Sequence, residues 1–99
     1  MDPPNSMRVR WEMSISREEF LRTLPAAVAG AHFRVEGELI SYGDASRGWH
    51  IRLVPMKALK IGLLDLPRHD VHISLIGYLE PEGKAFLERL EVYFRRGGG

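Results

Sequence analysis

Cysteine is absent from this chain of 99 residues. Disulfide bonds, thiolate metal ligands, thiol nucleophiles and dithiol redox pairs are therefore excluded. Long hydrophobic runs are absent as well, since the richest one, residues 61–66, is interrupted by Gly62 and Asp65. The sequence shows neither a membrane span nor the apolar segment of a signal peptide. We therefore expect a cytoplasmic protein that does not contact a membrane.

An excess of charge of one sign is also lacking. Fourteen lysine and arginine residues stand against thirteen acidic ones, which gives a formal net charge of +1. A domain that grips the phosphate backbone of a nucleic acid usually carries a clear basic excess. The charged fraction of 27% and the hydrophobic fraction of 44% are instead ordinary for a globular domain.

Alternating apolar and polar residues predict four strands, each with one buried face. The pattern runs through residues 7–15, 32–42, 49–54 and 71–76. Turn-forming residues at 43–48 predict that the second and third strands form an antiparallel hairpin, and Gly37 is interpreted as a bulge. Residues 55–66 fit neither period, and we expect a short strand over 59–64, with a loop as the alternative.

Two segments have the helical period. The first opens with Ser16-Arg17-Glu18-Glu19, a capping box in which the serine and the last glutamate satisfy each other's backbone amides. The second begins near Pro81, which suits a first helical turn because its missing N–H would be unpaired there. The apolar stripes of the two helices are Phe20, Leu21, Leu24 and Val28, and Phe86, Leu87, Leu90, Tyr93 and Phe94.

These elements predict an α+β fold of order β-α-β-β-(β)-β-α. Because each helix has one apolar stripe and each strand one apolar face, both helices should cover one face of a mostly antiparallel sheet of four or five strands. This two-layer sandwich forms a single domain over residues 7–96, between a flexible lead-in at 1–6 and a flexible glycine tail at 97–99. The predicted core contains Trp11, Phe20, Leu24, Phe33, Val35, Trp49, Ile51, Val71, Ile73, Leu75, Phe86, Leu90 and Phe94.

The two-layer fold leaves one face of the sheet uncovered. We expect this face to dock another protein or a second copy of the chain. The predicted binding residues are Arg52, Val54, His72, Ile76 and Tyr78. The alternative is a solvated face on which opposite charges pair across neighbouring strands.

One segment, Arg68-His69-Asp70-Val71-His72, contains residue types that bind metal ions. On a strand, Asp70 and His72 point to one face and His69 to the other. A neighbouring strand could add His50, and two imidazoles with a carboxylate can hold a divalent metal. The favoured alternative is that Asp70 lies in the turn, that the histidines are surface residues of a strand, and that no cofactor is bound. Because no serine lies in a nucleophile elbow and no glycine-rich phosphate loop is present, nothing in the sequence argues for an enzyme.

The chain ends in Arg95-Arg96-Gly97-Gly98-Gly99. This ending resembles the diglycine ends of ubiquitin-like modifiers and sulfur-carrier proteins. The resemblance implies a carrier whose terminal carboxylate enters the narrow channel of an activating enzyme. Those proteins are β-grasp folds in which the tail follows a strand, whereas here it follows a predicted helix. The alternative is ordinary helix termination, with arginines near the negative end of the helix dipole and glycine after the last turn.

Three strands followed by a helix also resemble the α-β-β-β-α order of double-stranded-RNA-binding domains, which would imply RNA binding. Those domains carry a lysine cluster where the last helix begins, and the residues here are Pro81-Glu82-Gly83-Lys84. Nucleic acid is therefore a disfavoured partner. We predict a non-catalytic interaction or self-association domain without cofactors. The alternatives are a glycine-tailed carrier, a metal-dependent activity at His50, Asp70 and His72, and weak RNA binding.

Overall fold

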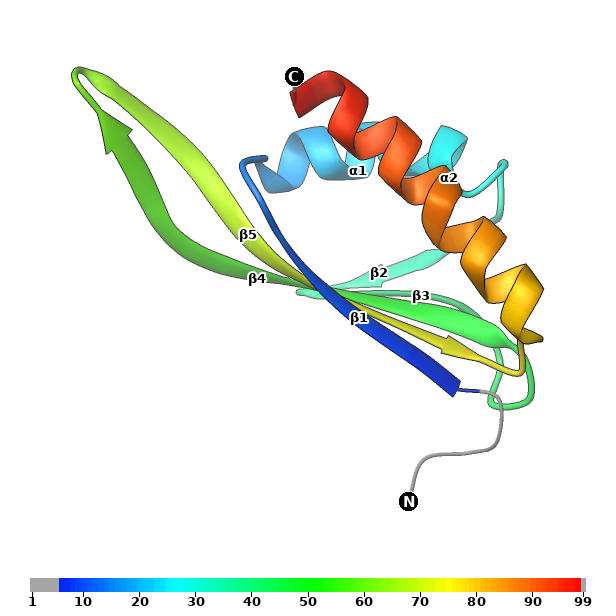
Figure 1. The fold of residues 1–99 in the computed structure, drawn as a ribbon. Helices are drawn as coiled ribbons and strands as arrows, with labels where there is room; N and C mark the ends of the chain where they lie inside the picture. Colours follow the sequence, from blue (N-terminus) through cyan, green and yellow to red (C-terminus); the bar gives the residue numbers. More distant parts are fainter. Residues whose placement is uncertain (1–5, 99) are drawn as a thin grey trace.

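The computed structural model describes residues 6–98, with side chains as far as residue 95. Five strands form one antiparallel sheet in the order β1-β5-β4-β3-β2, and two helices lie on one of its faces (Figure 1). The predicted α+β two-layer fold is thereby confirmed. In chain order, the elements are β1 (Ser6–Met13), α1 (Arg17–Ala27), β2 (Arg34–Glu36), β3 (Leu39–Gly43), β4 (Gly48–Ile61), β5 (Leu64–Ile76) and α2 (Glu80–Gly98).

Both helices begin at side chains that satisfy free backbone amides. Ser16 caps α1, and its Oγ accepts a hydrogen bond of 3.1 Å from the amide of Glu19. At α2, the carboxylate of Glu82 accepts a hydrogen bond of 2.9 Å from the amide of Leu79, just before the helix begins. The capping pattern in the sequence therefore predicted the start of α1 correctly, because a cap is a local interaction.

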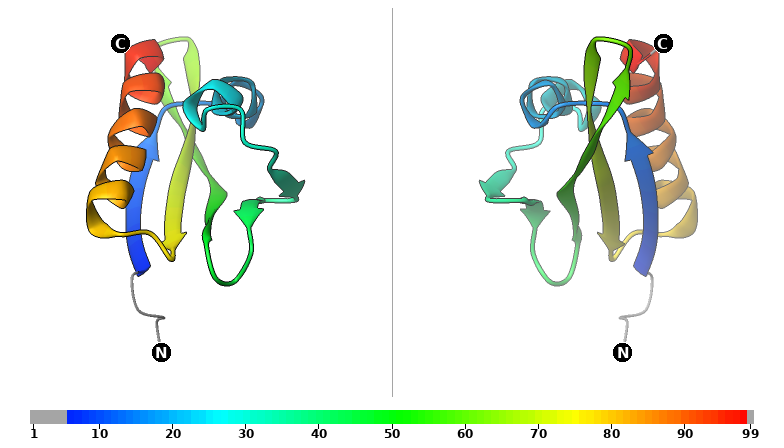
Figure 2. Two further views of the ribbon diagram at one scale, coloured as in Figure 1. Left: turned by 90° about the vertical axis from the view of Figure 1, so that its right-hand side faces the viewer. Right: turned by 90° about the vertical axis from the view of Figure 1, so that its left-hand side faces the viewer.

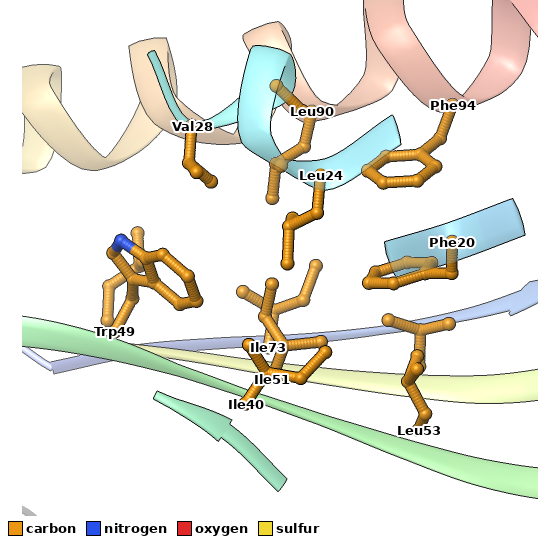
Figure 3. Close-up of a cluster of buried hydrophobic side chains, with 13 residues drawn as sticks. Phe20, Leu24, Val28, Ile40, Trp49, Ile51, Leu53, Ile73, Leu90 and Phe94 are labelled. Atoms are coloured by element: carbon orange, nitrogen blue, oxygen red, sulfur yellow. The ribbon is translucent and has the colours of Figure 1, made fainter. Parts of the chain in front are cut away.

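The core lies between the sheet and the two helices (Figure 3). Phe20 of α1 and Phe94 of α2 stack with their ring centroids 4.4 Å apart, which joins the two helices above the sheet. Leu24 and Leu90 are buried beside this pair. The buried apolar residues are Phe20, Leu24, Ala27, Val28, Ile40, Trp49, Ile51, Leu53, Val71, Ile73, Leu75, Leu90 and Phe94.

Most of the predicted core residues belong to this buried cluster. Three others, Trp11, Phe33 and Phe86, pack against it and are partly buried. The prediction for Val35 is wrong, because this residue lies on the short edge strand β2 and is 41% exposed. Ile40, which pairs with Ile51 in the register of β3 and β4, takes a central place in the core instead.

The predicted strand over residues 32–42 is in fact two strands. β2 pairs antiparallel with β3 across a turn at residues 37–38. Gly37 has a φ of 60°, a left-handed conformation that favours glycine, and it therefore reverses the chain instead of forming a bulge. As a result, Leu39 pairs with Arg52 on the open face, and Ile40 pairs with Ile51 on the core face.

The short strand predicted over residues 59–64 is wrong, because β4 and β5 continue through this region as one long hairpin. β4 runs to Ile61 and β5 starts at Leu64, with the turn at residues 62–63. The pairing shifts register between Met56 and Leu59 and then resumes. Figures 1 and 2 show the end of this hairpin extending away from the rest of the sheet.

The expected lead-in at residues 1–6 lies outside the described residues, apart from Ser6, with which β1 begins. At the other end, α2 extends to Gly98, so two residues of the expected glycine tail belong to the helix. Gly99 lies outside the described residues. Within residues 6–98, no helix is long and apolar enough to cross a membrane.

Candidate functional site

The register of the sheet places most of the predicted binding residues on the open face. His72 of β5 pairs with Arg10 on one side and Arg52 on the other, so the three share a row across β1, β5 and β4. Val54 lies opposite Asp70 in the adjacent row. The face therefore presents charged side chains at its centre.

The apolar residues predicted for this face do not form a continuous patch. Val54 pairs with Asp70, whereas Ile76 pairs with Gly48, six residues further along β5. At about 3.4 Å per residue, the two apolar side chains lie roughly 20 Å apart along the sheet. An interface core needs contiguous apolar surface, and this face does not supply it.

Tyr78 does not lie on the open face, contrary to the prediction. β5 ends at Ile76, and Gly77 turns the chain with a φ of 76°. The ring of Tyr78 then packs edge-on against Phe86 of α2, with centroids 5.9 Å apart, and the Arg47 guanidinium lies over it at 4.2 Å. Partial burial raises the pKa of the Tyr78 hydroxyl. This residue is part of the packing between the β3–β4 turn and α2.

Asp70 is the most enclosed charged group on the open face, with a side chain only 12% exposed. The Nε of Arg10 donates hydrogen bonds of 2.7 and 2.9 Å to its two oxygens, and Nε2 of His72 lies 3.2 Å from Oδ2. The hydrogen bonds from Arg10 lower the pKa of Asp70, burial opposes them, and His72 adds to the lowering. The carboxylate is therefore already paired with Arg10 of the neighbouring strand β1 and lies beside His72 of its own strand, as expected of a charge-paired face.

The lowered pKa of Asp70 predicts a pH-dependent contribution to stability. A carboxylate with a lower pKa in the folded state stabilises the fold above its ordinary pKa of about 3.9 and loses that effect as the pH falls through the lowered value. We therefore expect wild-type protein to exceed Asp70→Asn in unfolding free energy at pH 7, with a gap that closes toward pH 2. Urea unfolding across this range measures it.

The matched control for this titration is Glu88→Gln, which makes the same kind of change at an exposed position of α2. As a substitution at an exposed site, it should change the unfolding free energy by no more than about 0.5 kcal/mol. A gap for Asp70→Asn that is as large at pH 2 as at pH 7 would contradict the assigned charge pairing.

The metal-binding alternative receives no geometric support from the described residues. Asp70 and His72 are close together, but His50 pairs with Ser41 and Ser74 in a different row of the sheet. His69 points to the other face, as predicted, and its Nδ1 lies 2.8 Å from the carbonyl oxygen of Ile15. Within residues 6–98, no three histidine, aspartate or glutamate side chains are placed to hold a metal ion.

The part of β4 and β5 that sequence reasoning missed is the most distinctive surface of the molecule. In the register of the sheet, β1 pairs with β5 only as far as His69, and β3 pairs with β4 only from Arg52. Residues 56–68, which we call the arm, therefore pair only with each other in this register. A two-stranded hairpin is marginally stable by itself in water, so a covering surface would stabilise the arm.

The arm has one apolar face. Leu59 lies opposite Leu66 and Ile61 lies opposite Leu64, and cross-strand partners point to the same side of a sheet. Lys60 and the residue opposite it, Asp65, occupy the other side. The apolar face consists of Leu59, Ile61, Leu64 and Leu66, and Leu63 stands at the tip.

These apolar side chains are strongly exposed. The exposed fractions are 41% for Leu59, 54% for Ile61 and 63% for Leu64, and Leu63 is fully exposed. Single exposed apolar residues are common on protein surfaces, but four within six residues of one hairpin form a patch. Such a patch is typical of an interaction site.

A cleft of about 710 Å³ lies beside the arm, where β1 ends and the helices meet. We call it the arm cleft. Its apolar lining includes Met13, Ile15 and Phe94 from the body and Leu66 from the arm. The charged residues of its lining are Glu12, Glu19 and Arg95. Leu66 belongs both to the apolar face of the arm and to the lining of the cleft.

The sequence does contain a signal for the arm. Apolar and polar residues do not alternate regularly over residues 57–59. However, Leu59, Ile61, Leu64 and Leu66 are placed symmetrically about Gly62-Leu63. This mirror symmetry about a glycine-containing pair is the pattern of a hairpin with one apolar face. A single period fitted to residues 55–66 does not detect this symmetry, because the chain reverses direction within the segment.

Comparisons of the chain with protein-family models, with curated proteins and with solved structures found no match.

Proposed function

We propose that this chain is a non-catalytic self-association domain that associates through the apolar face of the arm. The observation that supports this proposal most directly is the clustering of exposed Leu59, Ile61, Leu63 and Leu64 on a hairpin without other strand neighbours. Burying one such side chain contributes about 1.5–3 kcal/mol relative to leaving it in water. Association through the arm would also stabilise the hairpin itself.

The docking surface proposed here is the arm, whereas the sequence predicted the open face of the sheet. On the open face, the side chain of Asp70 is enclosed by Arg10 and His72, and Arg52 lies 3.9 Å from Glu38. Removing such paired charges from water is expensive and returns little affinity. The arm presents apolar surface without that penalty. A cytoplasmic location is part of the proposal and is supported by the absence of cysteine.

The test compares two leucine-to-glutamate variants at almost equal exposure. Leu64 in the arm is 63% exposed, and Leu79, just before α2, is 61% exposed. Wild-type protein should associate in size-exclusion chromatography with light scattering, and Leu64→Glu should weaken association by about tenfold or more, since each 1.4 kcal/mol is a factor of ten. Leu79→Glu should associate like wild type.

Both positions are exposed, so neither variant should lose more than about 0.5 kcal/mol of folding stability. Thermal unfolding of the two variants at low protein concentration checks this. A monomeric wild-type protein would refute the proposal, and so would equal weakening of association by both substitutions.

A further inference from the structure

A depression on the open face brings four side chains that can donate hydrogen bonds together. Its polar lining residues, which we call the donor cluster, are Arg8, Arg10, His72 and Ser74, and its volume is about 310 Å³. Arg8 lies opposite Ser74, and Arg10 lies opposite His72, in the pairing of β1 with β5. Neighbouring strands are about 4.8 Å apart and alternate residues of a strand about 7 Å apart, so the cluster occupies the corners of a small rectangle.

Asp70 holds two members of the donor cluster in place and leaves most of their donors available. Both hydrogen bonds from Arg10 to Asp70 start at Nε, so they use one of the five N–H donors of the guanidinium. Asp70 approaches His72 at Nε2, and the second ring nitrogen is a further donor when the ring is protonated. The Asp70 side chain is enclosed, whereas those of Arg10 and His72 are exposed. The carboxylate therefore orients two exposed donor groups from below.

On β1 and β5, the carboxylates of the open face lie on one side of the donor cluster. Asp70 and Glu12 form the next row of the sheet toward the arm. Glu12 lies 3.4 Å from Arg68, which is one row further in the same direction. Of the described residues that line the depression itself, none is acidic. The depression therefore presents donors to a ligand without a carboxylate among them.

We propose that the donor cluster binds a phosphate group, either as free phosphate or as the monoester of a small molecule. Guanidinium groups match phosphate oxygens in geometry, and such charge-assisted hydrogen bonds are about twice as strong as neutral ones. A tetrahedral phosphate group directs its terminal oxygens to several sides, so it suits donors at four corners better than a planar carboxylate does. This binding goes beyond the proposed self-association and uses a different part of the molecule.

The rest of the depression favours a small ligand over a macromolecule. Its apolar lining residues are Val9 and Ile73, so it offers no aromatic ring on which a nucleic acid base could stack. Docking a protein here would remove the paired charges of Arg10 and Asp70 from water, which is costly. A small phosphate-bearing ligand leaves much of that pair in contact with water.

The test is a calorimetric titration with inorganic phosphate, at an ionic strength held constant with sodium chloride. Wild-type protein should show saturable binding. Arg8→Gln should weaken it by about tenfold or more, the usual loss when one charge-assisted hydrogen bond is removed. Ser74→Ala keeps the net charge and should still weaken binding several-fold, because it removes one hydroxyl donor. Absence of saturable binding by wild-type protein would overturn the site.

Arg22→Gln is the matched control, because it removes the same charge from the surface of α1, where Arg22 lies 3.3 Å from Glu18. Arg8 and Arg22 are both exposed, so each variant should remain folded. Arg22→Gln should bind phosphate like wild type. Equal weakening by the two substitutions would show general attraction of anions to the protein, and would refute a defined cluster.

Two further probes identify the source of the phosphate group. Glycerol 3-phosphate that binds more tightly than inorganic phosphate would assign a phosphorylated small molecule, and the reverse order would assign free phosphate. A single-stranded RNA oligonucleotide that binds when neither small probe does would assign the open face to nucleic acid and overturn the proposal. Leu64→Glu, in the arm, should bind phosphate like wild type. A monomeric wild-type protein that binds phosphate would therefore refute self-association and still support the donor cluster.

Discussion

Replacement of Leu90 by alanine is expected to lower the free energy of unfolding by about 2–5 kcal/mol, the usual range for a buried leucine. Leu90 is only 1% exposed and packs in the layer between α2 and the sheet, close to Leu24 (Figure 3). The variant loses the transfer free energy of the removed atoms and retains part of the cavity. Because a domain of this size has a total stability near the lower end of about 5–15 kcal/mol, the loss is a large fraction.

Val92→Ala is the matched control, since it shortens an apolar side chain two residues further along the same helix. Val92 is 55% exposed, so its truncation should change the stability by no more than about 0.5 kcal/mol. Urea unfolding followed by circular dichroism measures both. A similar small effect for the two variants would mean that α2 is not anchored through Leu90 and would contradict the two-layer packing.

Residues whose structure depends on nearby sequence were predicted well. Ser16 caps α1 because the serine and the amide that it accepts from are three residues apart. The stripe that contains Leu90 follows the helical period over a continuous segment, so its buried side could be read directly from the spacing. The same holds for Val71, Ile73 and Leu75 on β5, which alternate strictly and are all buried.

The errors occur where one residue changes the direction of the chain or where distant segments decide the outcome. Gly37 and Gly77 both adopt positive φ angles, and the sequence pattern does not distinguish such a turn from a bulge or a continuing strand. The turn at Gly37 divides the predicted strand over residues 32–42 into two strands. The turn at Gly77 directs Tyr78 away from the open face. The arm depends on where β1 and β3 stop pairing with their neighbours, which is a property of the whole sheet.

The predicted open-face site also depends on residues that are distant in the chain. Alternation correctly indicated that Arg52, Val54 and His72 share a face, because the side-chain period of a strand is two. Whether that face presents free or paired charges depends on the hydrogen bonds between Arg10 and Asp70, which are 60 residues apart in the chain. Only the register of β1 against β5 brings these two side chains together.

Gly77→Ala is expected to be among the most destabilising single substitutions in the chain, for two independent reasons. The φ of 76° is left-handed, and a residue with a Cβ pays about 1–2 kcal/mol to adopt it. In addition, a Cβ at this position would collide with the backbone carbonyl oxygen of Ser46, in the turn between β3 and β4. That turn is held in place, since the guanidinium of Arg47 donates to the carbonyl of Gly77 at 3.0 Å and to Glu82.

Gly37→Ala distinguishes the cost of the left-handed backbone conformation from the cost of the steric collision. Gly37 has a similar φ of 60°, but a Cβ there would have no atom within 4 Å. It should therefore lose only the backbone term of about 1–2 kcal/mol, whereas Gly77→Ala should lose about 3 kcal/mol or more, at the upper end of ordinary substitutions. Both are measured by urea unfolding. Because Gly77 follows the end of β5, whereas the arm contains the start of that strand, the folded fraction of Gly77→Ala should still self-associate (Figure 1). Equal losses for the two variants would show that the β3–β4 turn moves aside freely, and that the contacts of Arg47 do not fix it against α2.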